Sequence, residues 1–257
     1  MTRPVKVGER VEAIGHVALE GAESVLHRSF FRRARGQSEA PPVVLGLPLL
    51  RLIEQVRNLK PEDAARGYEV RLRGSVIWSH PSSRLCFVQD ASGGIAVELP
   101  RSLTTVPEVG MRVVVTGTSH SGDFAPVVQA DQVDFLDLLP LPEPRPVTLE
   151  HALTGVEEGQ WVTLSGYVRA AAATDGPWTR LDLTTSGGEF SAWVPAGERA
   201  QGLTGSAVKM KGVCTAETNA HRQLTGIRLL VSRNEDIEVE APKLADPFSL
   251  PLRTITS

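Results

Sequence analysis

The feature that most constrains how this chain folds is an internal repeat. Residues 67–76 and 159–168 align without a gap, and glycine, valine, leucine, glycine and valine coincide. Both segments alternate apolar and polar residues, the period of a strand with one buried face. Val70 and Leu72 point to one side, and Glu69 and Arg71 point to the other. A repeat of this length indicates one supersecondary unit built more than once.

The following segments repeat as well. Residues 85–99 and 181–194 each consist of an apolar run, a glycine turn and a second apolar run, which is typical of a β-hairpin. A third piece occurs three times, at residues 109–117, 207–212 and 7–15. The N-terminal copy resembles only this third piece, which is the last part of the repeat unit. The sequence therefore begins in the last part of a unit.

Each complete unit therefore has five strands in about 70 to 90 residues, a plausible small domain. Glycines such as Gly74 and Gly117 permit the sharp bends of a small closed sheet. The five-stranded OB barrel has this strand order, and a sandwich is the alternative. We predict an all-β chain of tandem five-stranded OB-like barrels with short connecting helices and an N-terminal partial repeat, a β-hairpin.

The repeat and the proline-rich stretch at 139–146 predict the domain boundaries. The segments are a partial repeat at 1–40, a linker and helix at 41–66, a first barrel at 67–139, a proline-rich linker and short helix at 140–158, a second barrel at 159–241 and an extended tail at 242–257. Residues 47–58 predict an amphipathic helix that presents Leu49, Leu52, Ile53 and Val56 on one face.

The overall charge limits the classes of partner. The net charge is −3 and the pI is about 6.1, so we do not expect nucleic acid as a partner. No stretch approaches the roughly 20 apolar residues of a membrane helix, and the start lacks the apolar core of a signal peptide. We therefore expect a soluble chain without an export address.

Signatures of catalysis are absent. The sequence has no phosphate-binding glycine loop, paired-histidine zinc motif or Cys-x-x-Cys, and no nucleophile elbow. The six histidines are scattered singly, and Cys86 and Cys214 lie within strand-like runs, as expected of buried thiols. We expect no enzyme activity, no cofactor and no metal.

The strings at 67–74, 87–95 and 122–127, with the proline-rich 141–147 and the closing 246–251, resemble the tandem OB-like sensor region of bacterial two-component histidine kinases. The resemblance runs from about residue 47 to the end. It implies a sensory or assembly role outside the cytoplasmic membrane, periplasmic if a kinase follows. The chain departs from the family pattern because it lacks both the membrane helix and the kinase core.

Two loops of the first barrel carry candidate ligand-binding residues. In OB barrels, the loops between strands 1 and 2 and between strands 4 and 5 flank the binding face. The candidates there are Trp78, His80, Arg84, Phe87, His120 and Phe124. The alternative, which we favour, is that Trp78 and Phe87 fill the core.

The second barrel offers candidates around its hairpin and its strand 4–5 loop. They are Trp178, Arg180, Trp193, His221 and Arg222. Tryptophan beside arginine can stack on bases or sugars, but packing within or between the barrels is favoured because aromatic residues make up only 5% of the chain. The basic run at 27–35 is interpreted as part of a strand rather than as a phosphate-binding patch.

We therefore predict a non-catalytic sensor, ligand-binding or protein-interaction module of a signal-transduction protein. The expected ligand is a small molecule, a glycan or a protein. The alternative is an OB-fold protein that binds single-stranded nucleic acid. The N-terminal hairpin has open edges, so we expect it to pair with another sheet edge and to drive self-association.

Overall fold

The computed structural model describes residues 11–20, 23–33, 47–80, 84–221 and 223–243. The chain divides into two compact units, Met1–Gly46 and Leu47–Ser257. In the first unit, β1 (Val11–Glu20) and β2 (Glu23–Arg33) form an antiparallel hairpin with a bulge between Ile14 and His16. The side chains of the basic run at 27–35 lie outside the described residues. The self-association that we expect of this hairpin stays a prediction.

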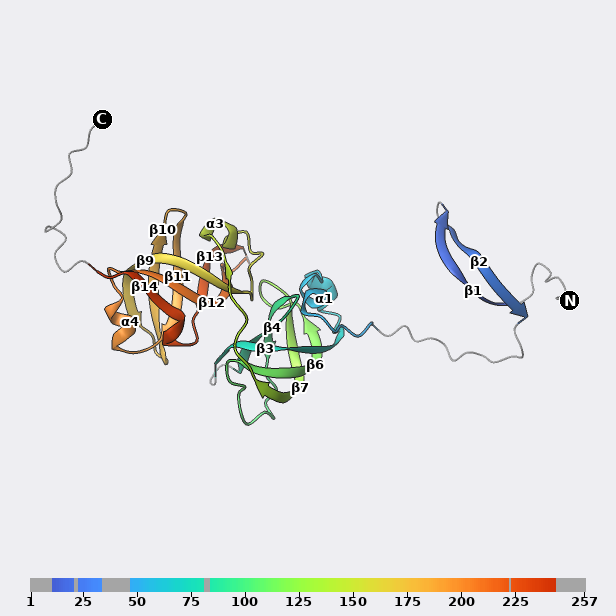
Figure 1. Ribbon diagram of the computed structural model, residues 1–257, viewed down its shortest axis with the longest axis horizontal. Coiled ribbons are helices and arrows are strands. Elements are labelled where there is room, and N and C mark those ends of the chain that lie inside the picture. The colour runs from blue at the N-terminus through green and yellow to red at the C-terminus, as the bar shows by residue number, and fades with distance from the viewer. Residues whose placement is uncertain (1–10, 21–22, 34–46, 81–83, 222, 244–257) are drawn as a thin grey trace, which may run out of the picture. The chain divides into compact units, whose positions relative to one another are not determined.

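The second unit begins with a closed five-stranded barrel (Figure 1). Its strands are β3 (Glu69–His80), β4 (Leu85–Asp90), β5 (Gly93–Glu98), β6 (Met111–His120) and β7 (Val127–Leu138). Around the barrel they follow the order β3-β4-β5-β7-β6, and only the β5–β7 pair is parallel. This is the connectivity of the OB fold.

A second barrel repeats the same connectivity. Its strands are β9 (Trp161–Ala173), β10 (Trp178–Thr185), β11 (Gly188–Pro195), β12 (Ala207–Thr218) and β13 (Leu224–Leu230). The ring β9-β10-β11-β13-β12 closes through β12 and β9, and β11 and β13 are its parallel pair. Two edge strands extend it, β8 (Arg145–Pro146) beside β9 and β14 (Ile237–Ala241) beside β12. The predicted fold class, tandem OB-like barrels, is confirmed.

The repeated glycines lie where the first strand of each barrel changes partners. Residues 69–75 of β3 pair with β6, whereas residues 75–80 pair with β4. A Cβ on Gly74 would lie 2.5 Å from the carbonyl oxygen of Gln89, so only glycine fits this corner. Gly166 occupies the equivalent corner of β9, where a Cβ would lie 3.0 Å from the ring of Phe190.

The described part of the chain also contains four short α-helices: α1 (Ile53–Arg57), α2 (Pro61–Ala64), α3 (Leu149–Ala152) and α4 (Glu198–Gly202). The predicted helix at 47–58 is wrong in its first half. The backbone of Leu50 instead forms hydrogen bonds with Glu69 and Arg71 of β3, at 2.9 Å each. Of the four residues of the predicted helix face, Leu49 and Leu52 are exposed, whereas Ile53 and Val56 are buried.

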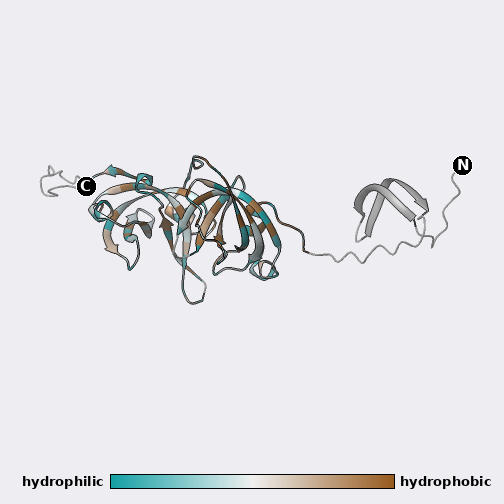
Figure 2. Cartoon of the chain, turned by 90° about the horizontal axis from the view of Figure 1, so that it is seen from below, coloured by the Kyte–Doolittle hydropathy of each residue, from teal (hydrophilic) through white to brown (hydrophobic). Residues whose placement is uncertain are grey.

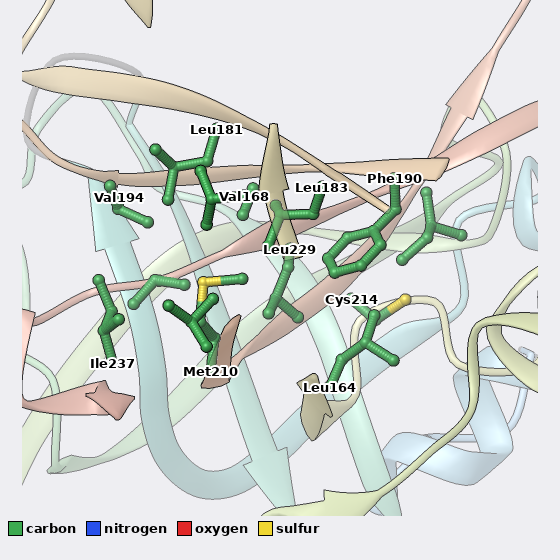
Figure 3. Close-up of a cluster of buried hydrophobic side chains, with 14 of the residues drawn as sticks. Leu164, Val168, Leu181, Leu183, Phe190, Val194, Met210, Cys214, Leu229 and Ile237 are labelled. Carbon is green, nitrogen blue, oxygen red and sulfur yellow. The ribbon is translucent and has the colours of Figure 1, made fainter. Parts of the chain in front are cut away.

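Each barrel encloses its own hydrophobic core. The first contains Val70, Leu72, Val88 and Val115, and the first helix covers it with Ile53 and Val56. The second contains Leu164, Leu181, Met210 and Leu229, which converge from four strands in Figure 3. Apolar and polar residues alternate along the strands (Figure 2), so one face of each strand lines the barrel interior. Among the described residues no helix is long and apolar enough to cross a membrane.

Candidate functional site

A third hydrophobic cluster lies between the two barrels. Its buried members are Ile77, Trp78 and Phe87 from the first barrel and Trp161, Val213 and Leu230 from the second. The outer surface of an OB barrel at strands 2 and 3 is the usual binding surface, and here part of it is covered by the neighbouring barrel. The apolar outer residues of β4 are therefore used to join the barrels.

Backbone and side-chain hydrogen bonds cross the same junction. Arg57 of α1 donates to the carbonyl oxygens of Gly94 at 2.9 Å, Val156 at 3.1 Å, and Glu158. Burial lowers the pKa of this guanidinium, an effect that the charge of Glu158 opposes. The backbone N–H of Trp161 donates to the side chain of Gln89 at 3.3 Å. These contacts hold the barrels together as one body.

The segment between the first and second strands of one barrel contacts the equivalent segment of the other barrel through stacked aromatic rings. The Trp78 ring lies 5.9 Å from the rings of both His80 and Trp178, and His80 lies 5.6 Å from Trp178. Phe87 contacts Trp78 edge to face, with centroids 5.9 Å apart. Trp78 and Phe87 are only 5% and 3% exposed. Four sequence-predicted site residues thus come together, but they pack against one another across the barrel junction.

A cavity of about 490 Å³ opens beside this cluster, between the barrels. We call it the inter-barrel groove; its lining residues are Leu85, Phe87, Ala96, Glu98, His120, the β6–β7 loop residues 121–125, Val127, Glu158, Thr215, Ala216, Thr218, Arg228 and Leu230. The groove brings together three residues predicted from the sequence, Phe87, His120 and Phe124. The ring of Phe124 reaches the turn after α3, because a Cβ on Gly155 would lie 2.8 Å from it.

Three carboxylates line the inter-barrel groove. Glu98 and Asp123 are exposed, and their side chains form no ion pair or hydrogen bond with other described residues. Glu158 is largely buried and accepts a hydrogen bond from the backbone N–H of Ala216 at 2.5 Å. Burial raises the pKa of Glu158, while that hydrogen bond and the charge of Arg57 act in the opposite direction.

The second barrel presents the equivalent outer surface with a different composition. Counted from the last strand pair before each hairpin turn, Phe87 corresponds to Asp182, and Leu85 corresponds to Arg180. Apolar residues in the first barrel are therefore replaced by charged residues in the second. A cavity of about 390 Å³ opens on this second-barrel face, which includes Arg169, Arg180, Asp182, Glu189, Ser191 and Glu217.

The charged side chains of the second-barrel face are arranged in pairs of opposite sign. Arg169 pairs with Glu189, and Arg180 pairs with Asp182 at 2.9 Å. All four of these side chains are at least half exposed. Exposed pairs of this kind contribute only about 0–1 kcal/mol each to stability. They are therefore available to exchange partners with a ligand.

Glu217 and Arg228 form a third pair between the two cavities. Their side chains are 2.7 Å apart, and Ser191 also donates to Glu217, at 3.0 Å. Glu217 lines the second-barrel face, whereas Arg228 lines the inter-barrel groove. The Arg228 guanidinium also lies 4.6 Å from the ring centre of Trp193, where it makes a cation–π contact. Trp193, a predicted site residue, is thus covered by Arg228.

Two further predicted site residues, Arg84 and His221, lie apart from both cavities. Arg84 donates to the carbonyl oxygens of Pro100 and Leu103 and so fixes the loop after β5. His221 is exposed in the β12–β13 loop, where its backbone N–H donates to Asn219 at 2.9 Å. Arg222 lies outside the described residues. Of the predicted residues in the second barrel, only Arg180 lies on the second-barrel face.

Sequence reasoning missed most charged residues of both cavities, among them Glu98, Glu158, Arg169 and Glu189. A usable signal was present, because aligning the two hairpins places Phe87 opposite Asp182. The apolar Phe87 at an outward position of the first barrel indicates that this surface is covered. The charged Asp182 at the equivalent position of the second barrel indicates that its surface is exposed to solvent.

The fully buried carboxylate of Glu157 forms a further group of ionic contacts in this unit. Its carboxylate pairs with Arg145, and it lies 2.9 Å from Nε2 of His151. These partners connect the proline-rich linker to α3. Within the described residues no group of histidine, cysteine and carboxylate side chains is arranged to hold a metal ion. Cys86 and Cys214 are both free and buried.

No protein-family model matches the chain, and no curated protein matches it either. Solved structures with similar chains do exist. The hypothetical protein ygiW from E. coli is 20% identical, with a TM-score of 0.27 over 35% of this chain and 89% of that one. A putative aspartyl-tRNA synthetase from Leishmania major is 12% identical, with a TM-score of 0.32 over 42% of this chain and 23% of that one.

A murine DNA-binding protein bound with double-stranded DNA is also similar, at 9% identity and a TM-score of 0.31, over 68% of this chain and 99% of that one. The sequence-based expectation that nucleic acid is unlikely as a partner is contradicted by this structure and is corrected, because it was based on net charge alone. Net charge averages over the whole surface, whereas Arg169, Arg180 and Arg228 lie at or beside one face. At these TM-scores the likeness carries no argument about which ligand this chain binds.

Proposed function

We propose that this chain is a non-catalytic binding module whose second-barrel face holds a partner protein. One observation carries the proposal. The two barrels share their connectivity, yet the outward surface of β4 is apolar and covered, whereas that of β10 is charged and open. The first barrel therefore uses this surface for assembly of the body, and the second leaves it accessible.

The charges of the second-barrel face favour a partner that bears both signs. Arg169, Arg180, Asp182 and Glu189 form a pattern in which cations and anions alternate. A peptide segment with complementary charges can replace these weak internal pairs with intermolecular ones. Such electrostatic complementarity contributes mainly to specificity and association rate, so we expect moderate, salt-sensitive binding.

Single-stranded nucleic acid is a second candidate ligand. The observation that favours it is the set of three arginines, Arg169, Arg180 and Arg228, at or beside a surface of OB type. Phosphates would have to displace the carboxylates with which these arginines pair. The aromatic residue of this face, Phe190, is only 5% exposed and so offers little ring surface for stacking of bases.

The resemblance to kinase sensor regions is compatible with this binding role. A sensory role would add an output, in which occupancy of the second-barrel face is communicated to another segment or protein. The proposed binding function does not depend on that addition.

A selection experiment tests the proposal. A phage library of random 12-residue peptides is selected against the wild-type chain and against the double exchange R180D/D182R. This exchange preserves the net charge and the internal ion pair but reverses the charge pattern. We expect the enriched peptides to carry both Lys or Arg and Asp or Glu, and to lose at least about tenfold in affinity for the exchanged variant.

Two outcomes would contradict the proposal. Peptides that bind the wild type and R180D/D182R equally well would show that the second-barrel face is not the binding surface. A labelled oligothymidylate that binds tightly, with strong salt dependence, and competes with the peptides would favour the nucleic-acid candidate. The substitution D175N, at an exposed loop residue away from both cavities, is the control and should change neither result.

A further inference from the structure

We propose that the inter-barrel groove is a separate binding site for an organic cation with an apolar body, such as an arylalkyl ammonium ion. The groove has about 490 Å³ of space, within the range of small-ligand sites. Its walls come from both barrels, so it exists only in the assembled body. It is distinct from the second-barrel face and requires none of that face's proposed binding activity.

The walls of the groove provide an apolar surface for the body of such a ligand. Leu85, Phe87 and Ala96 contribute from the first barrel, and Leu230 contributes from the second. Phe124, which is half-buried, extends from the β6–β7 loop toward Gly155. The half-buried ring of Phe124 also offers a π surface that attracts a cation.

The charges of the groove favour a cation over an anion. Glu98 and Asp123 have no cationic partner among the described residues, and Glu158 contributes a third carboxylate. Arg57 is the nearest positive charge that acts on Glu158, but its N–H groups are directed to three backbone carbonyl oxygens. Among the residues that the structure describes, the negative charge of Glu98 and Asp123 is therefore not neutralised by a cationic side chain.

The Arg228 and His120 side chains, which also line the groove, are both engaged elsewhere. Arg228 is paired with Glu217 and stacked on Trp193. The Nδ1 atom of His120 accepts a hydrogen bond from the backbone N–H of Gly122 at 3.4 Å, so this ring is turned toward its own loop. An anionic ligand would meet three carboxylates, whereas an ammonium ion would supply the charge that the groove lacks.

Isothermal titration calorimetry with 2-phenylethylamine tests the proposal on the full chain. The matched probes are 2-phenylethanol, which has the same body without the charge, and phenylacetate, which has the opposite charge. We expect the amine to bind, and the alcohol and the acid to give no saturable heat at the same concentrations. The variants E98Q and E158Q should each weaken amine binding by about threefold or more.

Controls separate a lost site from a lost fold. E158Q keeps an oxygen that can accept from Ala216, and Glu98 is exposed, so E98Q tests the groove even if E158Q unfolds. D175N removes a carboxylate elsewhere and should leave amine binding unchanged. Equal binding of amine and alcohol, or amine binding that neither E98Q nor E158Q weakens, would overturn the proposal.

The same measurements distinguish this site from the proposed protein-binding face. R180D/D182R should leave amine binding unchanged, because neither residue lines the groove. Conversely, E98Q should leave peptide binding unchanged, because Glu98 is not part of the second-barrel face. Loss of amine binding in R180D/D182R would show that the amine binds at the second-barrel face and not in the inter-barrel groove, and would overturn the inference.

Discussion

Gly94 of the first barrel and Gly159 of the second approach so closely that a Cβ added to Gly94 would lie 2.1 Å from the carbonyl oxygen of Gly159. Gly159 itself has a φ of +73°, a conformation that side-chain-bearing residues rarely adopt. Arg57 donates to the carbonyl oxygen of Gly94, so the contact is fixed from both sides. The two OB barrels thus meet backbone to backbone.

The first prediction concerns this contact. The substitution G94A should force the barrels apart locally and lower the free energy of unfolding by about 1–3 kcal/mol, the usual cost of overpacking. Urea denaturation monitored by circular dichroism measures the change. The matched control is G202A, because a Cβ on Gly202 would meet no atom within 4 Å. A G94A variant as stable as the wild type would contradict the close approach of the two barrels.

The second prediction concerns the two thiols. Burial raises the pKa of Cys86 and of Cys214 to about 12, and for Cys214 the carboxylates of Glu158 and Glu157 add to the effect. Because the thiolate is the reactive form, neither thiol should react with Ellman's reagent at pH 8 in the folded chain. Both should react once urea unfolds it. Rapid modification of either thiol without denaturant would show that this thiol is accessible to solvent in the folded chain.

The third prediction concerns the pH dependence of stability. Burial raises the pKa of Glu158 above its ordinary value of 4.5, so the folded chain binds this proton more tightly than the unfolded chain does. The contribution of Glu158 to stability is therefore fully present below pH 4.5 and is lost as the pH rises through the raised pKa.

The variant E158Q isolates this effect. It keeps the hydrogen-bond acceptor for Ala216 but has no titratable group. Relative to the wild type, E158Q should gain stability between pH 4 and pH 7. Urea denaturation of both proteins at pH 4, 5.5 and 7 measures the difference between their free energies of unfolding. The titration of all other groups contributes equally to both proteins and cancels to first order. A difference that is constant with pH would contradict a raised pKa for Glu158.

The sequence predicted the barrels because strand alternation and glycine corners are local properties. Val70 and Leu72 identify a strand with one buried face, and Gly74 marks the bend between sheet partners. The helix at 47–58 was overestimated because a tertiary contact, the pairing of Leu50 with Val70, competes with helical periodicity. That contact is not visible in the local pattern.

The candidate site was less predictable because it depends on how the barrels meet. Trp78 and Phe87 carry the residue types of a ligand-binding surface, yet the second barrel covers them. The burial of Glu158 likewise depends on contacts with Arg57 and Ala216, which lie far from it in the sequence. The charged second-barrel face, by contrast, was accessible to a comparison of outward positions such as Phe87 and Asp182.

The covered first-barrel surface is the central claim, and the tryptophans report on it directly. All four tryptophans of the chain belong to the hydrophobic cluster between the barrels or pack against it: Trp78 and Trp161 are members, and Trp178 and Trp193 pack against it. Acrylamide quenching of tryptophan fluorescence in the native chain is therefore the most direct measurement. We predict weak quenching and blue-shifted emission in the native chain; on unfolding, quenching should increase and the emission should shift to the red. Quenching of the native chain as strong as that of free N-acetyltryptophanamide would show that the barrels do not cover this surface.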